Sequence, residues 1–508
     1  MAPRLEFSFT FARPSGQTEP SRDDDSPFKI LVLGNFSGGG ESSGRLPLPQ
    51  RPFIRTDVDQ FDKAMSKLSP RLTLGEGPSA QVLEFRTLDD FRPEQLSQQL
   101  KAFRQLHELR KKLLNPATFA QAAAELKQSL TVQEPGSSEP VAPPHNPSPE
   151  NDADLLEQLL GTRPAGLSAP TGPQSGALPG IEQFINKMME PYIVPKADPN
   201  QGVYLAAVDS ALGDLLRAVL HLSSFQSLEA TWRCLQELVS NIDDDSAVQI
   251  FLLDVTQQEL LADLPADGQQ LGGWSLYRRL SSDSNQTSVP WSLLVGDFRF
   301  GASSEELPLL GALAVTAEHL QIPLISAANS NLLGCSSFAE TPDPAEWKSL
   351  EADVAKYWTA LRQSSAAKWV ALVLPRVLLR LPYGKETDEV ETFAFEEFAN
   401  GRAHENYLWG NPAYFCAGLI AQAFAEEGWG LQLGSQYDIG SLPAHTYSED
   451  DEVKLQPCGE ITFSQRVADL MLEKGFMPLI SWKDRDAVRL LRFQSIAEPL
   501  APLSGPWE

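Results

Sequence analysis

The sequence has few of the residues that carry cross-links or metal sites. Its 508 residues include only 4 cysteines and 6 histidines. The cysteines form no CxxC pair, and none lies near a histidine at the spacing of metal ligands. This scarcity excludes a disulfide-rich secreted scaffold and predicts buried free thiols in a reducing compartment. The cysteines are Cys234, Cys335, Cys416 and Cys458.

Basic residues are also scarce. There are 41 lysines and arginines against 67 aspartates and glutamates, which gives a formal net charge of -26. A field of this sign repels phosphate backbones, so nucleic-acid binding would need a strong local basic patch. The densest basic run, Arg110 to Lys112, has the pattern of a helix end, and we expect no nucleic-acid partner.

Long apolar runs are missing as well. Residues 1–11 contain no continuous apolar stretch of the kind found in signal peptides and membrane spans. We therefore expect a cytoplasmic protein without membrane insertion.

The first residues have a strand pattern instead. Apolar residues alternate with Glu6, Ser8 and Thr10, and this alternation places four apolar side chains on one face of a strand. We expect this strand to pair with the sheet edge of a partner. The four residues are Leu5, Phe7, Phe9 and Phe11.

A polar segment interrupts the chain between Thr131 and Gly180. It contains ten prolines and few aromatics, so it is predicted to be a disordered linker. Within it, residues 152–160 form a short amphipathic helix pattern, which either binds a partner or packs back on its own domain. The apolar residues of this linker helix are Leu155, Leu156, Leu159 and Leu160.

The rest of the sequence alternates between helix-length and strand-length patterns. This alternation predicts an α/β fold, α+β overall, with layered domains and a mixed, largely parallel sheet flanked by helices. Strands are expected at residues 28–33, 81–85, 248–255, 291–296, 323–328 and 369–374. Helices are expected at residues 59–68, 93–114, 208–222, 225–240, 257–264, 274–280, 305–320, 347–363 and 412–427.

No motif satisfies the requirements of a catalytic site. The glycine-rich loop Gly34–Gly40 follows a strand, but it has neither the Lys-Ser/Thr ending nor the GxGxxG spacing of a phosphate-binding loop. The acidic run Glu449–Glu452 lacks the spaced ligands of a calcium loop, and His221 and His319 fall on helix faces. We therefore expect no catalytic residue, no cofactor and no metal, and a protein that is not an enzyme.

Several longer motifs resemble the large subunit of the type VI secretion contractile sheath. They occur in the family's order, with Cys234 where the family usually has glycine. The matching stretches are residues 225–233, Pro290–Gly301, Leu374–Gly384, Tyr407–Tyr414, Leu442–Tyr447 and Gly475–Leu479.

The first part of the sequence resembles the small subunit of the same sheath. The matching stretches are Arg4–Phe11, Phe28–Gly38, Arg51–Ile54, Pro70–Leu72, Val82–Phe85 and Leu88–Pro93, together with Asp57, Asp59 and Phe61. The two resemblances together imply a natural fusion. The expected parts are a small-subunit-like domain at 1–130, the linker at 131–180, a large-subunit-like α/β domain at 181–400, and a large-subunit-like C-terminal region at 401–508.

The resemblance implies a non-enzymatic assembly component in the cytoplasm of a Gram-negative bacterium. Its implied partners are other sheath subunits or itself, the inner tube protein, the baseplate, and the sheath-disassembly AAA+ ATPase, which would recognise the linker helix. The family's large subunit continues beyond the Gly475–Leu479 motif with a helical and strand segment, whereas this sequence stops at Glu508. The alternative is therefore an accessory paralogue that caps, docks on or regulates the sheath or baseplate.

Overall fold

The computed structural model describes residues 24–39, 45–75, 80–115, 118–119, 121–123, 201–242, 247–265, 271–286, 289–434, 437–449, 451–482 and 485–507. The chain divides into two compact units. The first unit combines residues 1–68, 228–381 and 407–508, and the second combines residues 69–227 and 382–406. The expected domains follow one another along the chain, whereas these units interleave early and late segments.

A nine-stranded sheet forms the centre of the first unit, in the order β11-β15-β14-β8-β7-β6-β1-β5-β2. Neighbouring strands are parallel along the run β14-β8-β7-β6-β1-β5. The other three strands, β2, β15 and β11, are antiparallel to their neighbours. The expected mixed, largely parallel sheet is thus confirmed. The strands are β1 (Phe28–Gly34), β2 (Ile54–Thr56), β5 (Val248–Asp254), β6 (Leu293–Phe300), β7 (Leu324–Ala328), β8 (Val370–Leu374), β11 (Asp438–Ile439), β14 (Met477–Ser481) and β15 (Val488–Leu490).

Helices cover both faces of this sheet, as expected for parallel strands that are apolar on both sides. One face packs against a large apolar core formed with α9 (Gln257–Ala262), α10 (Ser275–Gln286), α11 (Glu306–Leu320), α12 (Ala352–Arg362) and α14 (Gln465–Glu473). The other face packs against α13 (Pro412–Glu427) and the later part of α8 (Ser223–Ser240). Helix α1 (Phe61–Leu68) follows β2.

Two small two-stranded sheets also belong to the first unit. Strand β9 (Val377–Leu378) pairs with β10 (Trp409–Gly410), and β12 (His445–Glu449) pairs with β13 (Glu452–Gln456). Both pairs are antiparallel. Glu449 and Glu452, the ends of the acidic run, therefore lie opposite each other at the end of β12 and the start of β13.

The second unit contains the hairpin of β3 (Arg71–Leu74) and β4 (Gln81–Glu84), and helices α2 (Pro93–Gln99), α3 (Lys101–Leu114) and α7 (Gln201–Leu220). The single helix expected at 93–114 is wrong, because Leu100 is extended (φ -84, ψ 129) and separates α2 from α3. The Gln81 side chain accepts the Lys101 N–H at 3.1 Å, which satisfies a donor at the start of α3.

Helices α3 and α7 pack against each other. Arg110 on α3 and Asp209 on α7 form an ion pair of 2.5 Å. At the end of α3, the Gln201 side chain donates to the Leu113 carbonyl at 2.5 Å. The two helix ends that residues 115–200 connect are therefore in contact.

A helix that crosses a bilayer needs about 20 predominantly apolar residues. Among the helices of the described residues, none is both long enough and apolar enough to do so.

Candidate functional site

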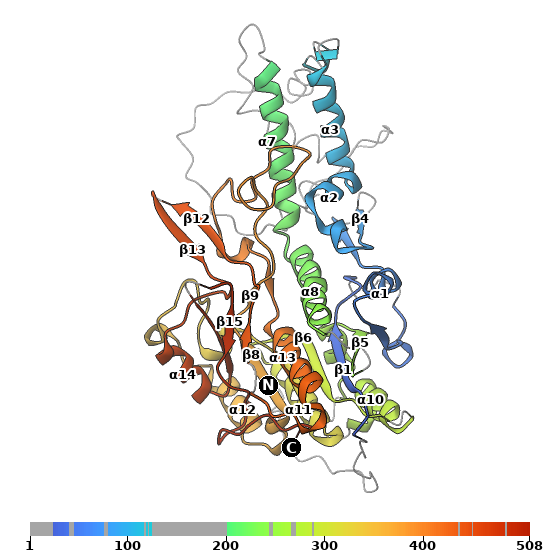
Figure 1. The fold of residues 1–508 in the computed structure, drawn as a ribbon, viewed down its shortest axis with the longest axis vertical. Helices are drawn as coiled ribbons and strands as arrows, with labels where there is room; N and C mark the ends of the chain where they lie inside the picture. The colour runs from blue at the N-terminus through green and yellow to red at the C-terminus, as the bar shows by residue number, and fades with distance from the viewer. Residues whose placement is uncertain are drawn as a thin grey trace, which may run out of the picture. The chain divides into compact units, whose positions relative to one another are not determined.

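Strand β1 joins the two sequence parts in one sheet. It lies between β5 and β6, which both come from the large-subunit-like part (Figure 1). All seven of its residues pair with β5, from Phe28 opposite Val248 to Gly34 opposite Asp254. Ile30 to Leu33 pair with β6 on the other side. The first part of the chain thus supplies a central strand to the sheet of the second part.

The side chains of β1 are buried on both faces of the sheet. Leu31 and Leu33 belong to the large apolar core, and Phe28 packs on the opposite face against Phe424, with ring centroids 5.0 Å apart. Trp429 contacts Phe28 as well, and its indole N–H donates to the Ser26 carbonyl at 2.9 Å. Five β1 side chains have no exposed surface: Phe28, Ile30, Leu31, Val32 and Leu33.

The residues that follow β1 also contact the large-subunit-like part, through Trp232 on α8. Its indole N–H donates to the Phe36 carbonyl at 2.9 Å, and its ring makes an edge contact with Phe36. Phe61 on α1 makes a second edge contact with the same indole, at 5.7 Å. One buried tryptophan of the large-subunit-like part therefore anchors both the β1 loop and α1.

A partly buried cluster of two arginines and two carboxylates lies at the carboxyl end of β1 and β5. Arg51 binds Glu259 through two hydrogen bonds of 2.6 and 3.0 Å and donates to the Asp254 carbonyl at 2.7 Å. Arg45 lies 3.2 Å from both Asp254 and Glu259. The charges balance within the cluster, which is the condition under which buried ions are tolerated. Both arginines come from the small-subunit-like part and both carboxylates from the large-subunit-like part.

Glu259 has a second role at the start of α9. It forms a capping box with Thr256, whose hydroxyl accepts the Glu259 N–H at 3.0 Å. Burial alone would raise the pKa of Glu259, but the hydrogen bonds from Arg51 and Thr256 and the charges of Arg51 and Arg45 lower it to about 2. The carboxylate is therefore charged in the folded protein at neutral pH.

The glycine-rich loop after β1 takes part in the same cluster. The Ser37 hydroxyl donates to the Asp254 carboxylate at 2.8 Å and accepts from Arg45 at 2.8 Å. Arg45 also donates to the Asn35 side chain. The polar side chains of this loop are thus engaged by protein groups, as expected of a loop that holds two segments together.

A partly buried aspartate, Asp297, lies on β6 next to a register shift between Gly296 and Arg299. Asp297 accepts a hydrogen bond from the Thr231 hydroxyl at 2.6 Å and one from the Asn411 amide at 3.4 Å. Burial raises the pKa of Asp297 to about 6, despite these hydrogen bonds. A β-carbon added at Gly34 would lie 2.9 Å from the Asp297 β-carbon, so β1 needs glycine at this position.

The residues selected from the sequence as interface candidates lie outside the described residues. These are Leu5, Phe7, Phe9 and Phe11 of the N-terminal strand and Leu155, Leu156, Leu159 and Leu160 of the linker helix. Their roles stay predictions.

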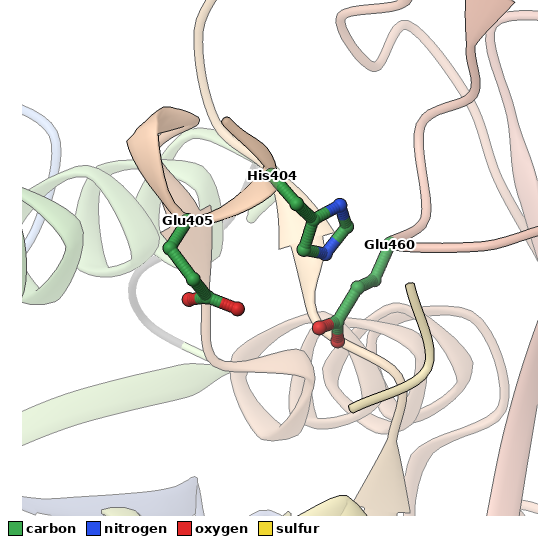
Figure 2. Close-up of side chains that lie close together, drawn as sticks. All are labelled: His404, Glu405 and Glu460. Atoms are coloured by element: carbon green, nitrogen blue, oxygen red, sulfur yellow. The ribbon is translucent and has the colours of Figure 1, made fainter. Parts of the chain in front are cut away.

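Figure 2 shows three titratable side chains that the sequence analysis did not group: His404, Glu405 and Glu460. His404 and Glu405 belong to the second unit, and Glu460 belongs to the first. Within the first unit, Glu460 forms an ion pair with Arg376. Because the residues come from different units, we assign them no common site.

The ion cluster between the two parts of the chain could not be predicted from the sequence. Its arginines and carboxylates are separated by more than 200 residues (for example Arg51 and Glu259 by 208), and no local pattern links them. Only the Thr256-x-x-Glu259 capping box is visible in the sequence, and it predicts a helix start rather than an ion cluster.

This arrangement defines a class of protein whose central feature is a shared sheet, completed by a strand from a separate part of the chain. Comparison with protein families agrees with this division. The family described as EvpB/VC_A0108, tail sheath N-terminal domain, matches residues 203–497. The family described as type VI secretion system, VipA, VC_A0107 or Hcp2, matches residues 3–134. The chain belongs to the tail sheath family of type VI secretion and joins a small-subunit-like to a large-subunit-like part.

Two relatives from Pseudomonas aeruginosa match the chain, one for each subunit type. The type VI secretion system sheath protein TssC1 is 33% identical over 305 residues, which cover 58% of this chain and 61% of TssC1. The sheath protein TssB1 is 25% identical over 135 residues, which cover 25% of this chain and 77% of TssB1. The expected fusion of the two sheath subunit types is thus confirmed.

Proposed function

We propose that this protein is a non-enzymatic structural component of the type VI secretion sheath, in which one chain forms a fused sheath-like protomer. The observation that carries the proposal is β1, which is buried between two strands of the large-subunit-like part. Since a strand in this position is part of the core, the two parts act as one building block. We also propose the domain boundaries expected from the sequence, at residues 130, 180 and 400.

The protomer assembles with further copies or with other sheath subunits in the cytoplasm, around an inner tube and on a baseplate. The N-terminal segment with Leu5, Phe7, Phe9 and Phe11 links neighbours by strand exchange, because an extended segment satisfies an open sheet edge. The linker helix with Leu155, Leu156, Leu159 and Leu160 is the contact for the sheath-disassembly ATPase.

Electron microscopy of the purified protein tests the assembly. We expect tubes with a regular repeat, alone or with an inner tube protein. A variant without residues 4–11 should keep the circular dichroism and melting temperature of the full chain and form no tubes. The control replaces the same residues with a Gly/Ser segment of equal length, which removes the strand pattern and keeps the chain length.

Two results would contradict the proposal. Tube formation by the deletion variant would exclude strand exchange through this segment. Persistent small complexes that bind only the ends of separately formed sheaths would favour the accessory role, in which the protein caps or regulates a sheath.

A further inference from the structure

A pocket of about 170 Å³ lies beside β2, within the first unit. Its polar side is formed by the end of β2 and the residues that follow, and its apolar side by the end of α8, the residue Ile242 and the start of β5. A cavity of about 150 Å³ accommodates a molecule the size of benzene, so this pocket has room for one long side chain. The lining residues are Thr56, Asp57, Val58, Asp59, Val239, Ile242, Val248 and Ile250.

Asp57 in this pocket is a buried carboxylate that forms no ion pair with another described residue. It is 9% exposed, and it accepts hydrogen bonds from the Gln60 backbone N–H and side-chain amide at 2.8 and 2.5 Å. Both donors are neutral. Buried carboxylates are normally paired with a cation, because burial of a charge without a counter-charge is costly. Asp57 therefore lacks the cationic partner that its burial requires.

The neighbouring Thr56 has an unused hydroxyl. Thr56 is 2% exposed, and its side-chain oxygen makes no hydrogen bond with any described residue. A hydroxyl oxygen can accept two hydrogen bonds and donate one, and the large majority of buried hydroxyls make at least one. A donor that enters the pocket finds this oxygen as an acceptor. Two adjacent buried groups thus lack partners at the same pocket.

The surroundings of the pocket add negative charge. Asp59 is exposed, lines the pocket and forms no ion pair with another described residue. The described lining contains no lysine or arginine. In the sequence, residues 243–245, which lie outside the described residues, are all aspartates and stand between Ile242 and Val248. This charge favours a cation over a neutral or anionic ligand.

The apolar side of the pocket selects the kind of cation. Val239, Val248 and Ile250 are buried, and Val58 at the surface is 60% exposed. A calcium or magnesium ion needs about six or more oxygen ligands around it, whereas the polar groups here stand on one side. A polyamine would place its further charges against the apolar side. Lysine and arginine have one charged head and an aliphatic stem that packs along apolar surface.

We infer that the pocket beside β2 binds a lysine or arginine side chain of a partner protein. The charged head pairs with Asp57 and Asp59 and donates to the Thr56 hydroxyl, and the stem packs against the side chains from α8 and β5. This site does not depend on the proposed assembly into tubes, because all of its lining residues belong to one unit of a single chain.

Saturation-transfer difference NMR of short peptides with the full chain tests the site, because it detects weak ligands of proteins and of large assemblies alike. The probes are the blocked tripeptides acetyl-Ala-Lys-Ala-amide and acetyl-Ala-Arg-Ala-amide. We expect at least one of them to bind saturably, with the strongest transfer to the methylenes of its basic side chain. The same peptide with acetyllysine keeps the stem and removes the charge, and should bind at least about tenfold more weakly, since a hydrogen bond to a charged group contributes at least this factor.

Two variants assign the binding to the pocket. Asp57→Asn removes the charge and keeps an acceptor for the Gln60 N–H, and it should weaken binding at least about tenfold. Its matched control is Asp62→Asn, at an exposed aspartate of α1 outside the lining, which should leave binding unchanged. Thr56→Val removes the unused hydroxyl and should weaken binding about threefold to tenfold without lowering the melting temperature.

Several results would overturn this assignment. Equal binding of the lysine and acetyllysine peptides would show that the charge has no role. An equal loss in Asp57→Asn and Asp62→Asn would show attraction to the general negative charge and no built site. Displacement of the peptide by magnesium chloride or spermidine at a tenfold lower concentration than by unlabelled peptide would make this a metal or polyamine site. A lower melting temperature of Thr56→Val would show that the hydroxyl already has a partner.

Discussion

Cutting the linker should leave two chains that stay together. The perturbation is a specific protease site introduced between Thr131 and Gly180, followed by complete cleavage. The chain is then divided into a small-subunit-like fragment with β1 and a large-subunit-like fragment with β5 and β6. If β1 is a core strand, its non-covalent contacts must hold the two fragments together after the linker is cut.

The magnitude follows from the burial of β1. Five of its side chains have no exposed surface, and each fully buried apolar side chain contributes about 1.5–3 kcal/mol, so β1 alone contributes roughly 7–15 kcal/mol before the cost of association. A flexible tether supplies an effective concentration of about 1 mM, which corresponds to about 4 kcal/mol. The gross burial energy of β1 thus exceeds the roughly 4 kcal/mol that the tether supplies.

Size-exclusion chromatography and native mass spectrometry at micromolar concentration measure the result. We expect the cleaved fragments to elute together with the mass of the intact chain. Leu31→Ala removes a core contact worth about 2–5 kcal/mol and should weaken the affinity of the fragments by roughly 30-fold to several thousand-fold. Leu46→Ala, at a residue that is 53% exposed, is the matched control. Separation of the unmutated fragments would refute the assignment of β1 as a core strand between the two parts.

Three further predictions concern the buried charges, each measured by urea unfolding. Arg51→Ala leaves the Glu259 carboxylate with Arg45 as its remaining arginine partner and should cost about 1–3 kcal/mol. Arg51→Lys keeps the charge and should cost less, and equal losses would exclude a role for the charge. The pKa of Glu259 is lowered from 4.5 to about 2, so its charge contributes about 3 kcal/mol of stability above pH 4.5, and this contribution is lost as the pH falls to about 2. The stability difference between Glu259→Gln and the unmutated protein should therefore shrink over this range. A constant difference would contradict the assignment. The pKa of Asp297 is raised from 3.8 to about 6, so its charged form lowers the free energy of unfolding by about 3 kcal/mol above pH 6 and by nothing below pH 4. Asp297→Asn should remove this pH dependence of stability. An unchanged dependence would show that another group causes it.

The sequence predicted the long elements of the first unit well, because each has a strong local pattern. The apolar run Phe28–Leu33 was predicted as a buried strand and is β1, and the helix expected at 412–427 is α13. Short strands such as β2, with three residues, are too short to show a period and were missed. The break between α2 and α3 was missed because nothing in the local apolar spacing marks Leu100 as extended.

The neighbours of each strand were beyond the reach of local patterns. The burial of β1 on both faces was visible in its apolar run, but its partners β5 and β6 lie more than 200 residues later. For the same reason, Arg45 and Arg51 could not be connected with Asp254 and Glu259. The sequence therefore predicted the class of fold and the family, and the structure was needed for the joint between the two parts.

The contact between the ends of α3 and α7 bears on the purpose of the linker. Gln201 donates to the Leu113 carbonyl, so residues 115–200 connect two points that are already adjacent. Connections between packed helices usually need about 2–8 residues. A longer loop is tolerated because each doubling of its length costs only about 0.6 kcal/mol. The fold thus requires no particular length or sequence of this connection. The apolar pattern at residues 152–160 therefore needs a reason other than joining the helices. We propose recognition by a partner as this reason. Such a contact can be lost or gained without changing the sheet that β1 completes.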